Sequence, residues 1–482
     1  MLKRVALFAL AVTLILSSGY LVKSRLGKTA QIRRAKRWGT LANPRFDGQQ
    51  IRTILFFAGE QLDGQTLEQN NCQALPGNIT FDCKTAWPSD QTYLDWKNPA
   101  NRVHAVQKVV DLGFNTISMS TWGESWLPCT EKCPTVPHDC CGKINPDRTC
   151  EKPVPRCFGE KEKQRCRIGW YGAANTQLSP AAKNELFDAT AGQSILIMPF
   201  IESRFDYDWN FRTDFPYSLD ERFKGQHAPG LISQVEDLIT TYIKNRAHPD
   251  WGNKWAQVYD QHGEKRYAVV IVQAASDSIG PNDHQKFAEA FDEAAGKILA
   301  DTQVRVGFFI DPIAPNPTSN YGCPGIDVGQ IESTYAASFH PDPEKTGTWL
   351  YHQSSILGIH AYSPEGWVDG FPTITGRPVN ECFKIRWKED FSRRWHDTGI
   401  PFLQDVTPGY DGTKLFRNRP GLHRWGYNQQ WCDALLGMTR RYGQAGMVYN
   451  SWNGYCEGLA AMETQEMGSF NVNFIHRLME NY

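Results

Sequence analysis

The chain has 482 residues, of which 41% are hydrophobic and 21% charged, and its net charge is -1 at pH 7. These values are those of a folded globular protein with ample apolar side chains for a large core, and they exclude a disordered chain. The balanced charge gives no indication of a nucleic-acid partner, and none is predicted.

An apolar run at residues 5–22 lies near the start, directly after Lys3 and Arg4. With about 18 mostly apolar residues, it is long for a signal-peptide core and just long enough to span a bilayer. Residues 1–38 are therefore predicted to be a signal peptide or a signal-anchor with a basic flank. Because the heavier basic flank follows the run, the positive-inside rule argues against an uncleaved anchor with an exported body. Both readings stay open, and the predicted location is secreted, or membrane-anchored with the remainder extracellular or luminal.

Thirteen cysteines are present, and seven of them fall in residues 127–169, a Pro- and charge-rich segment without a helical or strand period. Such a segment lacks a core of its own, so we predict a disulfide-rich insertion in an exported protein. A zinc site is the weaker alternative, because paired C-x-x-C units are missing, and no metal or other cofactor is predicted. The triplet that begins at Asn78 fits an N-glycosylation acceptor.

Short apolar runs recur from residue 51 onward, and most of them end in polar residues. Runs of this length, separated by longer segments, are typical of the buried strands of a parallel sheet. Eight runs are expected to form strands: 52–60, 115–123, 194–202, 267–276, 304–311, 356–364, 401–410 and 446–452.

Between these runs lie segments with helical period, several of them preceded by Pro, Asn or Asp. Eight strands alternating with helices predict a single (β/α)8 TIM barrel over residues 51–482, with the Cys-rich loop insertion after its second strand. A doubly wound open sheet is the alternative, but the chain lacks a Gly-rich phosphate-binding turn. The expected helices are 100–112, 180–191, 231–245, 283–300, 382–398 and 422–442.

Carboxylates and aromatic residues gather where the predicted strands end. Convergent acids are what glycoside hydrolysis requires, since one carboxyl protonates the leaving oxygen and another attacks or stabilises the developing cation. Any one such acid is more often a helix cap or a partner of Arg, so the prediction depends on the set. The set comprises Glu60, Glu124, Glu202, Asp277, Asp311, Glu365, Asp405, Asp411 and Glu457.

Two segments resemble motifs of glycoside hydrolase family 99, the endo-α-mannosidase and endo-α-mannanase family. Residues 404–419, QDVTPGYDGTKLFRNR, are similar to its P-G-Y-x-D segment, and residues 450–457, NSWNGYCE, to its S-F/W-N-E-W-H-E-G motif. The run that ends at Glu202 is similar to a family strand ending in I-E, and the three occur in the family's order.

The resemblance implies a (β/α)8 barrel and a retaining endo-glycosidase with two glutamates three residues apart. The acid/base glutamate of the family matches Glu457, whereas the second position is occupied by Gly454, which has no side chain to take a proton. Cys456 also replaces the family's histidine, so the substrate contacts near the scissile bond differ and mannose specificity is not carried over. Three outcomes stay open: another acid, Glu202, Glu365, Asp405 or Asp411 from a different strand, takes the role of the second glutamate; the chain uses an ordinary two-carboxylate mechanism; or it binds glycans without cleaving them.

We therefore predict a glycoside hydrolase acting on the α-linked glycans of a polysaccharide or glycoprotein, with catalytic residues Glu457, Glu202, Asp405 and Glu365. A non-catalytic glycan-binding barrel and an extracellular interaction protein are the alternatives. Aromatic and polar residues near the strand ends suit sugar rings. The expected substrate contacts are Tyr410, Asp411, His360, Tyr362, Trp122, Trp452, Asn453 and Tyr455.

Overall fold

The structure is a computed structural model, and it describes the barrel strands and most of the helices around them. The structure describes residues 48–57, 85–96, 98–120, 125–128, 157–158, 165–168, 180–202, 231–274, 284–312, 317, 319–325, 341–362, 380–413, 424–455 and 458–482.

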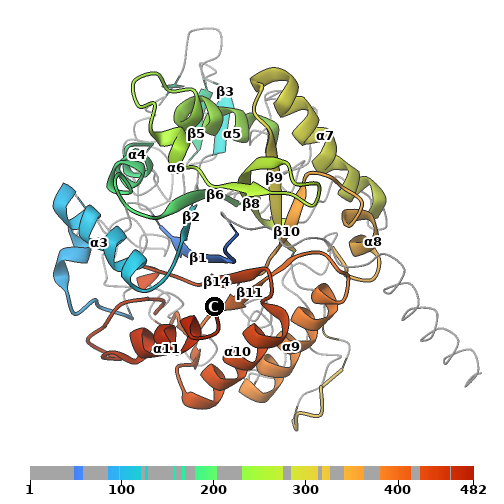
Figure 1. The fold of residues 1–482 in the computed structure, drawn as a ribbon. Helices are drawn as coiled ribbons and strands as arrows, with labels where there is room; N and C mark the ends of the chain where they lie inside the picture. Colours follow the sequence, from blue (N-terminus) through green and yellow to red (C-terminus); the bar gives the residue numbers. More distant parts are fainter. Residues whose placement is uncertain are drawn as a thin grey trace, which may run out of the picture.

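Eight parallel strands of the described chain close into a barrel (Figure 1). Each strand pairs in parallel with the next, β6 also pairs with β8, and β14 returns to pair with β1. The predicted (β/α)8 fold is confirmed, and all eight expected strands are present. Around the barrel they are β1 (Ile51–Phe56), β2 (Thr116–Ser120), β6 (Leu196–Glu202), β8 (Lys265–Ala274), β9 (Val306–Pro312), β10 (Ile356–His360), β11 (Phe402–Val406) and β14 (Gly446–Tyr449).

Helices surround the barrel, and the alternation of side chains along each strand gives two cores. One core fills the interior of the barrel. Leu55, Phe200 and Phe309, from three different strands, belong to it. The other packs the outer strand faces against the helices. The main helices are α3 (Pro99–Asp111), α4 (Pro180–Ala189), α5 (Leu231–Leu238) with its π-helical extension η4 (Ile239–Ile243), α7 (His284–Thr302), α8 (Thr346–Leu350), α9 (Glu381–His396), α10 (Gln429–Tyr442) and α11 (Phe470–Met479).

Three of the described helices begin at an asparagine cap, and one of them corrects a predicted range. Asn98 caps α3 ahead of a proline, and Asn380 caps α9. The helix expected from residue 422 begins only at Gln429, because Asn428 is its cap. The three residues 424–426 before it form strand β13 (Arg424–Gly426) instead.

The described backbone of the Cys-rich insertion forms a small antiparallel sheet. It lies between β2 and α4, and its central strand β5 (Arg165–Ile168) pairs with β3 (Ser125–Pro128) and β4 (Cys157–Phe158). The disulfides expected there lie outside the described residues. A disulfide elsewhere joins Cys323, after β9, to Cys382 at the start of α9, and the thiol of Cys432 is free and buried.

A short strand seals the amino end of the barrel. β7 (Gln257–Tyr259) runs antiparallel to β8, and Val258 belongs to the interior core. Beside it the buried Asp260 accepts a hydrogen bond from Arg266 Nε at 2.6 Å, and Arg266 also donates to Val306 O at 3.2 Å. The opposite rim, at the carboxyl ends of the strands, is where the active sites of barrels of this type lie.

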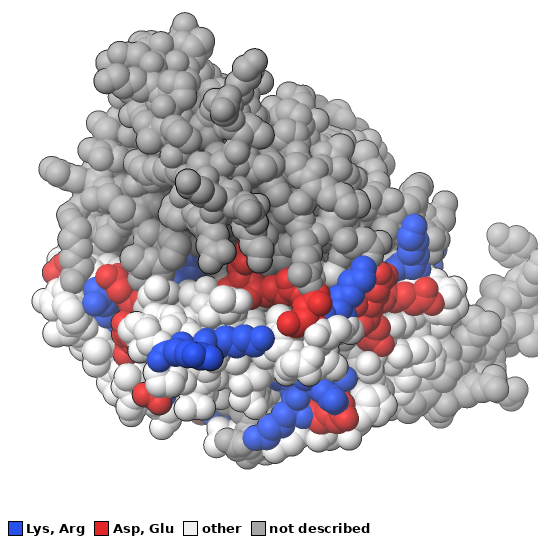
Figure 2. Space-filling view, turned by 90° about the horizontal axis from the view of Figure 1, so that it is seen from above, with Lys and Arg blue, Asp and Glu red and all other residues white. Residues whose placement is uncertain are grey.

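Exposed charges on the outer wall pair with one another. Figure 2 shows acidic and basic side chains next to each other on the described part of the face seen there. On α7, a carboxylate oxygen of Glu293 lies 3.3 Å from Nζ of Lys297, and both side chains are more than 40% exposed. Pairs of this kind contribute little to stability because water already solvates both charges.

We expect Asp260→Asn to lower the free energy of unfolding by about 3 kcal/mol, because it removes the nearer and buried of the two carboxylates beside the Arg266 guanidinium and leaves only the exposed Glu264 at 3.7 Å. Urea unfolding followed by circular dichroism measures the change. Glu293→Gln is the matched control and should shift stability by less than about 0.5 kcal/mol. Equal midpoints for the two variants would show that the buried pair does not stabilise the closed end.

Candidate active site

The carboxyl ends of the barrel strands form one rim, and the predicted site residues divide into those the structure describes there and those it does not. Glu457, Glu365 and Trp122 lie outside the described residues. Glu202 is the last residue of β6, with its backbone paired to β8, and its side chain is outside the description. Eight of the predicted residues therefore have described side chains.

The two family-like segments meet at this rim. A hairpin of β12 (Gly409–Asp411) and β13 follows β11, while the segment ending at Gly458 follows β14. Gly458 has a φ of 72°, and a Cβ placed on it would lie 2.9 Å from Asp411 Cβ. Asp411 therefore packs directly against the residue that follows Glu457.

Thr85 connects the same two segments from the opposite side. Its backbone N–H donates to Tyr455 O at 3.0 Å, and its hydroxyl donates to Asp411 O. A single residue thus fixes the backbone of the hairpin relative to the backbone just before Glu457.

The Asp411 carboxylate is ordered by its neighbours. Oδ1 accepts hydrogen bonds from the N–H of Thr413 at 3.1 Å and from its hydroxyl at 2.6 Å. Oδ2 lies 3.5 Å from Nε of Arg424, and the side chain is 18% exposed. This predicted contact residue is therefore held at the surface of the hairpin, with one oxygen facing a cation.

Tyr410 belongs to an aromatic stack on the hairpin. Its ring is nearly parallel to that of Trp425, with centroids 5.8 Å apart. Nζ of the buried Lys384 lies 4.9 Å from the Trp425 ring on the helix α9 side, a cation–π arrangement. The stack fixes the orientation of the half-buried Tyr410 ring.

Gly454, the position that differs from the family pattern, is tightly packed. A Cβ placed there would lie 2.9 Å from Ser451 Oγ and 3.2 Å from Leu459 Cβ. The Gly454 N–H also donates to Ser451 Oγ at 3.0 Å. A glutamate side chain does not fit this backbone without displacement, so the loss of the second glutamate is matched by the local packing.

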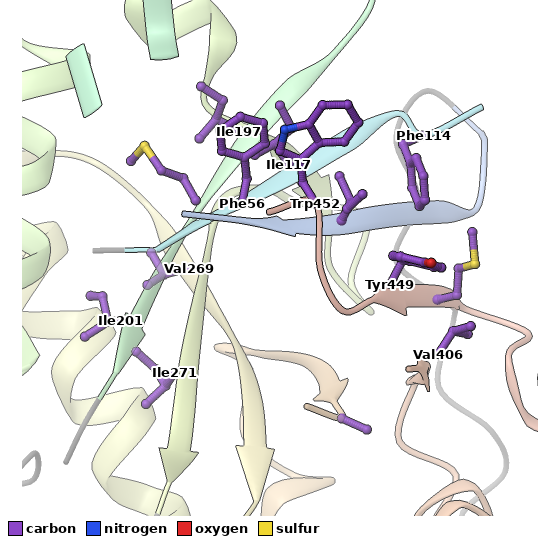
Figure 3. Packing of buried hydrophobic residues seen from close by; sticks show 14 of the residues in the cluster. Phe56, Phe114, Ile117, Ile197, Ile201, Val269, Ile271, Val406, Tyr449 and Trp452 are labelled. Atoms are coloured by element: carbon purple, nitrogen blue, oxygen red, sulfur yellow. The ribbon is translucent and has the colours of Figure 1, made fainter. Parts of the chain in front are cut away.

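Trp452, Asn453 and Tyr455 are buried and serve the packing of the loop after β14. The Trp452 indole is parallel to the Phe56 ring at 6.0 Å, beside it in Figure 3. The Phe57 N–H donates to Asn453 Oδ1 at 2.9 Å, and Asn453 Nδ2 donates to Phe57 O at 2.8 Å. Trp452 and Asn453 thus make packing and hydrogen-bond contacts within the fold. That Trp452, Asn453 and Tyr455 contact the substrate stays a prediction.

Asp405, a predicted catalytic acid, forms a buried ion pair with Lys388 of α9. Both side chains have no exposed surface, and the Thr407 hydroxyl donates to the carboxylate at 3.1 Å. The Lys388 ammonium also lies 6.0 Å from the Trp431 ring. The negative charge of Asp405 is therefore balanced within the fold.

His360 takes part in a polar chain inside the barrel. Thr53 Oγ1 lies 2.9 Å from Ser118 Oγ, which lies 3.5 Å from His360 Nε2, so the chain joins β1, β2 and β10. Nδ1 of His360 has no hydrogen-bond partner in the described part of the chain. Burial lowers the pKa of His360 to about 3, so the imidazole is neutral at physiological pH.

Asp311 and Tyr362 complete the inner wall beside His360. Asp311 is the next-to-last residue of β9, is buried, and accepts a hydrogen bond from the Tyr362 N–H at 2.9 Å. The Tyr362 ring meets the Phe200 ring edge-on at 5.6 Å. Asp311 is among the strand-end acids of the sequence but not among the predicted site residues, because nothing in its local sequence distinguishes it from a cap.

Metal binding finds no support in the described residues, in which no group of three His, Cys, Asp or Glu side chains lies close enough to hold an ion. The chemistry of the described rim is that of carboxylates, amides, hydroxyls and aromatic faces. This inventory suits a polyhydroxylated ligand.

Comparison with known proteins gives fold likeness only. No protein-family model and no curated protein matches the chain. Among solved structures, the chain is similar to the GH99 endo-alpha-mannosidase from Bacteroides thetaiotaomicron, with 11% identity, 89% of this chain and 97% of that chain covered, and a TM-score of 0.48. It is also similar to an endo-1,4-beta-mannanase from Rhizomucor miehei, with 10% identity, coverage of 92% and 99%, and a TM-score of 0.46. At such values the likeness carries no argument about activity, and the fold assignment depends on the strand pairing.

We expect Gly454→Ala to destabilise the protein by about 1–3 kcal/mol, because the added methyl group overpacks Ser451 and Leu459. Chemical denaturation measures the loss. Gly296→Ala in α7 is the control, since a Cβ there meets nothing within 4 Å and should be neutral or stabilising by up to about 1 kcal/mol. Equal stabilities would contradict the packing constraint at Gly454.

The free energy of unfolding should fall as the pH decreases from about 6 toward 3. In that range the His360 imidazole binds a proton in the unfolded chain but stays neutral when it is buried in the folded protein. The folded-state pKa of His360 lies below the unfolded value, so its contribution is complete above the unfolded pKa. The His360→Gln variant should lose up to about 1.4 kcal/mol per pH unit of this dependence in urea unfolding across that range. His104→Gln, at an exposed position, should keep it, and identical slopes in all three proteins would contradict a buried neutral imidazole.

Proposed function

We propose that the protein is a glycoside hydrolase that cleaves α-linked glycans of a polysaccharide or glycoprotein, with Glu457 as general acid/base. The observation that supports this most directly is the contact of Asp411 with Gly458, bridged by Thr85. It brings together, at the rim of a (β/α)8 barrel, the two segments that resemble family 99 motifs. Active sites of such barrels lie at this rim.

We assign the second carboxylate to Glu202. Gly454 offers no side chain, and the charge of Asp405 is balanced by Lys388 in a pair with no exposed surface. Glu202 ends β6, three strands from β14 around the barrel in the order β14, β1, β2, β6. Glu365, which follows β10, and Asp411 are the remaining candidates.

In the proposed reaction the Glu457 carboxyl donates its proton to the glycosidic oxygen as the bond from that oxygen to the anomeric carbon breaks. The second carboxylate either attacks the anomeric carbon or activates the water that does so. Water supplies the hydroxyl of the new reducing end, and its proton returns to a carboxylate. A separation of about 5–5.5 Å between the carboxyls favours the first route and about 6.5–9.5 Å the second.

A non-catalytic glycan-binding barrel is the second candidate. The packed Gly454 favours it, because the family's paired glutamates are absent, and the aromatic stack of Tyr410 on Trp425 serves binding as well as catalysis. This candidate predicts that the protein binds glycans and that no turnover depends on Glu457.

We further propose an exported protein. The disulfide between Cys323 and Cys382 supports an oxidising compartment. Among the described residues, no helix has the length and apolarity needed to cross a membrane, and the apolar run at 5–22 lies outside them.

Product release should be measured from a panel of α-mannans, α-glucans and N-glycans, with the protein lacking residues 1–38. We expect Glu457→Gln to reduce cleavage by more than about a hundredfold, because general acid catalysis contributes that much or more. Glu202→Gln should cause a loss of similar size, while both variants remain folded.

The exposed Glu293→Gln variant serves again as the control and should retain full activity. Full activity of Glu457→Gln would remove that residue from the mechanism. Binding without cleavage by the unmodified protein would favour the glycan-binding barrel instead.

A further inference from the structure

Tyr427 occupies a constrained position between the hairpin and α10. Its backbone is left-handed, with a φ of 54°, which is uncommon for a residue with a large side chain. Its N–H donates to Pro408 O at 2.8 Å, and the next residue, Asn428, caps α10 and donates to the carboxylate of Glu381. Such conformations persist only where the surroundings over-determine them, and they are concentrated at functional sites.

The side chain of Tyr427 contacts both of the segments that meet at the rim. A Cβ placed on Gly409 would lie 2.5 Å from the Tyr427 ring, so the ring lies flush against the hairpin backbone. At its other end, the Tyr427 hydroxyl donates to Gly458 O at 2.5 Å. The ring therefore spans from the start of β12 to the residue after Glu457.

The backbone ahead of Glu457 in the sequence is held by other contacts. Tyr455 O accepts hydrogen bonds from the N–H groups of Thr85 and Ala86, at 3.0 and 3.2 Å, and the Gly458 N–H donates back to Tyr455 O at 3.2 Å. Tyr455 and Gly458, on either side of Glu457 in the sequence, are thus held by different elements. The Tyr427 hydroxyl and the packing of Asp411 both hold Gly458 against the hairpin.

We propose that Tyr427 is a positioning residue for the general acid: through Gly458 it sets where Glu457 stands relative to Asp411 and the bound glycan. The inference rests on the proposed function. A general acid must lie within hydrogen-bond reach of the leaving oxygen, and a displacement of about 1 Å costs up to about a hundredfold in rate. Removing the hydroxyl takes away one of the contacts that hold Gly458, the residue after Glu457 in the sequence.

The test uses Tyr427→Phe on two substrates of the same sugar. One is the glycan that the unmodified protein cleaves, whose leaving group needs a proton, and the other is its 2,4-dinitrophenyl glycoside, whose leaving group does not. We expect kcat to fall about tenfold on the glycan and by less than about twofold on the aryl glycoside, with KM unchanged. A merely structural role would lower both rates equally.

Tyr482→Phe is the matched control, because the Tyr482 hydroxyl also donates to a glycine carbonyl, Gly443 O at 3.4 Å, before β14. It should leave both rates unchanged, and thermal unfolding should confirm that both variants are folded. Equal losses on the two substrates, or no loss, would overturn the role of Tyr427 while Glu457→Gln still discriminates between the substrates. If Glu457→Gln affects both substrates equally, the general acid is another residue and both proposals fail.

Discussion

The closed circle of parallel hydrogen bonds is the constraint on which the rest of this structure depends. Because β14 pairs with β1 and β6 with β8, all eight strands point the same way and their carboxyl ends meet at one rim. β11 and β14 are neighbours in that circle, so the segments that follow them come into contact although they are about fifty residues apart in the chain. The interior is filled by side chains and the amino end is closed by β7, which leaves the rim as the place where polar groups remain available.

Glycines set the spacing at this rim. Gly409 admits the Tyr427 ring, Gly454 admits Ser451 and Leu459, and Gly458 admits Asp411, each at a distance that a Cβ would forbid. Close backbone approach replaces side-chain packing there, which makes the junction compact and holds its hydrogen bonds in register. The same compactness leaves no room for a glutamate side chain at position 454 without displacement, so the catalytic pair of the proposed function spans two strands instead of one turn.

The strand positions and the barrel class could be predicted because buried parallel strands leave continuous apolar runs, as in residues 194–202 and 267–276. The roles of single polar residues could not. Trp452 and Asn453 have the composition of a sugar site, yet their partners, Phe56 and Phe57, are almost four hundred residues away. Lys388 looks like an exposed helix residue, and only the fold shows that it neutralises Asp405. Tyr427 belongs to no motif, and its importance follows from two contacts that no local pattern encodes. For Glu457, Glu365 and Trp122 the sequence remains the only guide.

The closed end of the barrel also determines how the molecule presents itself. β1 begins at Ile51 on that side, and the last residue, Tyr482, lies there too, with its hydroxyl on Gly443. A group joined after Tyr482 is therefore attached on the side opposite the rim. A partner domain or a solid support fused there would leave the rim facing outward and uncovered.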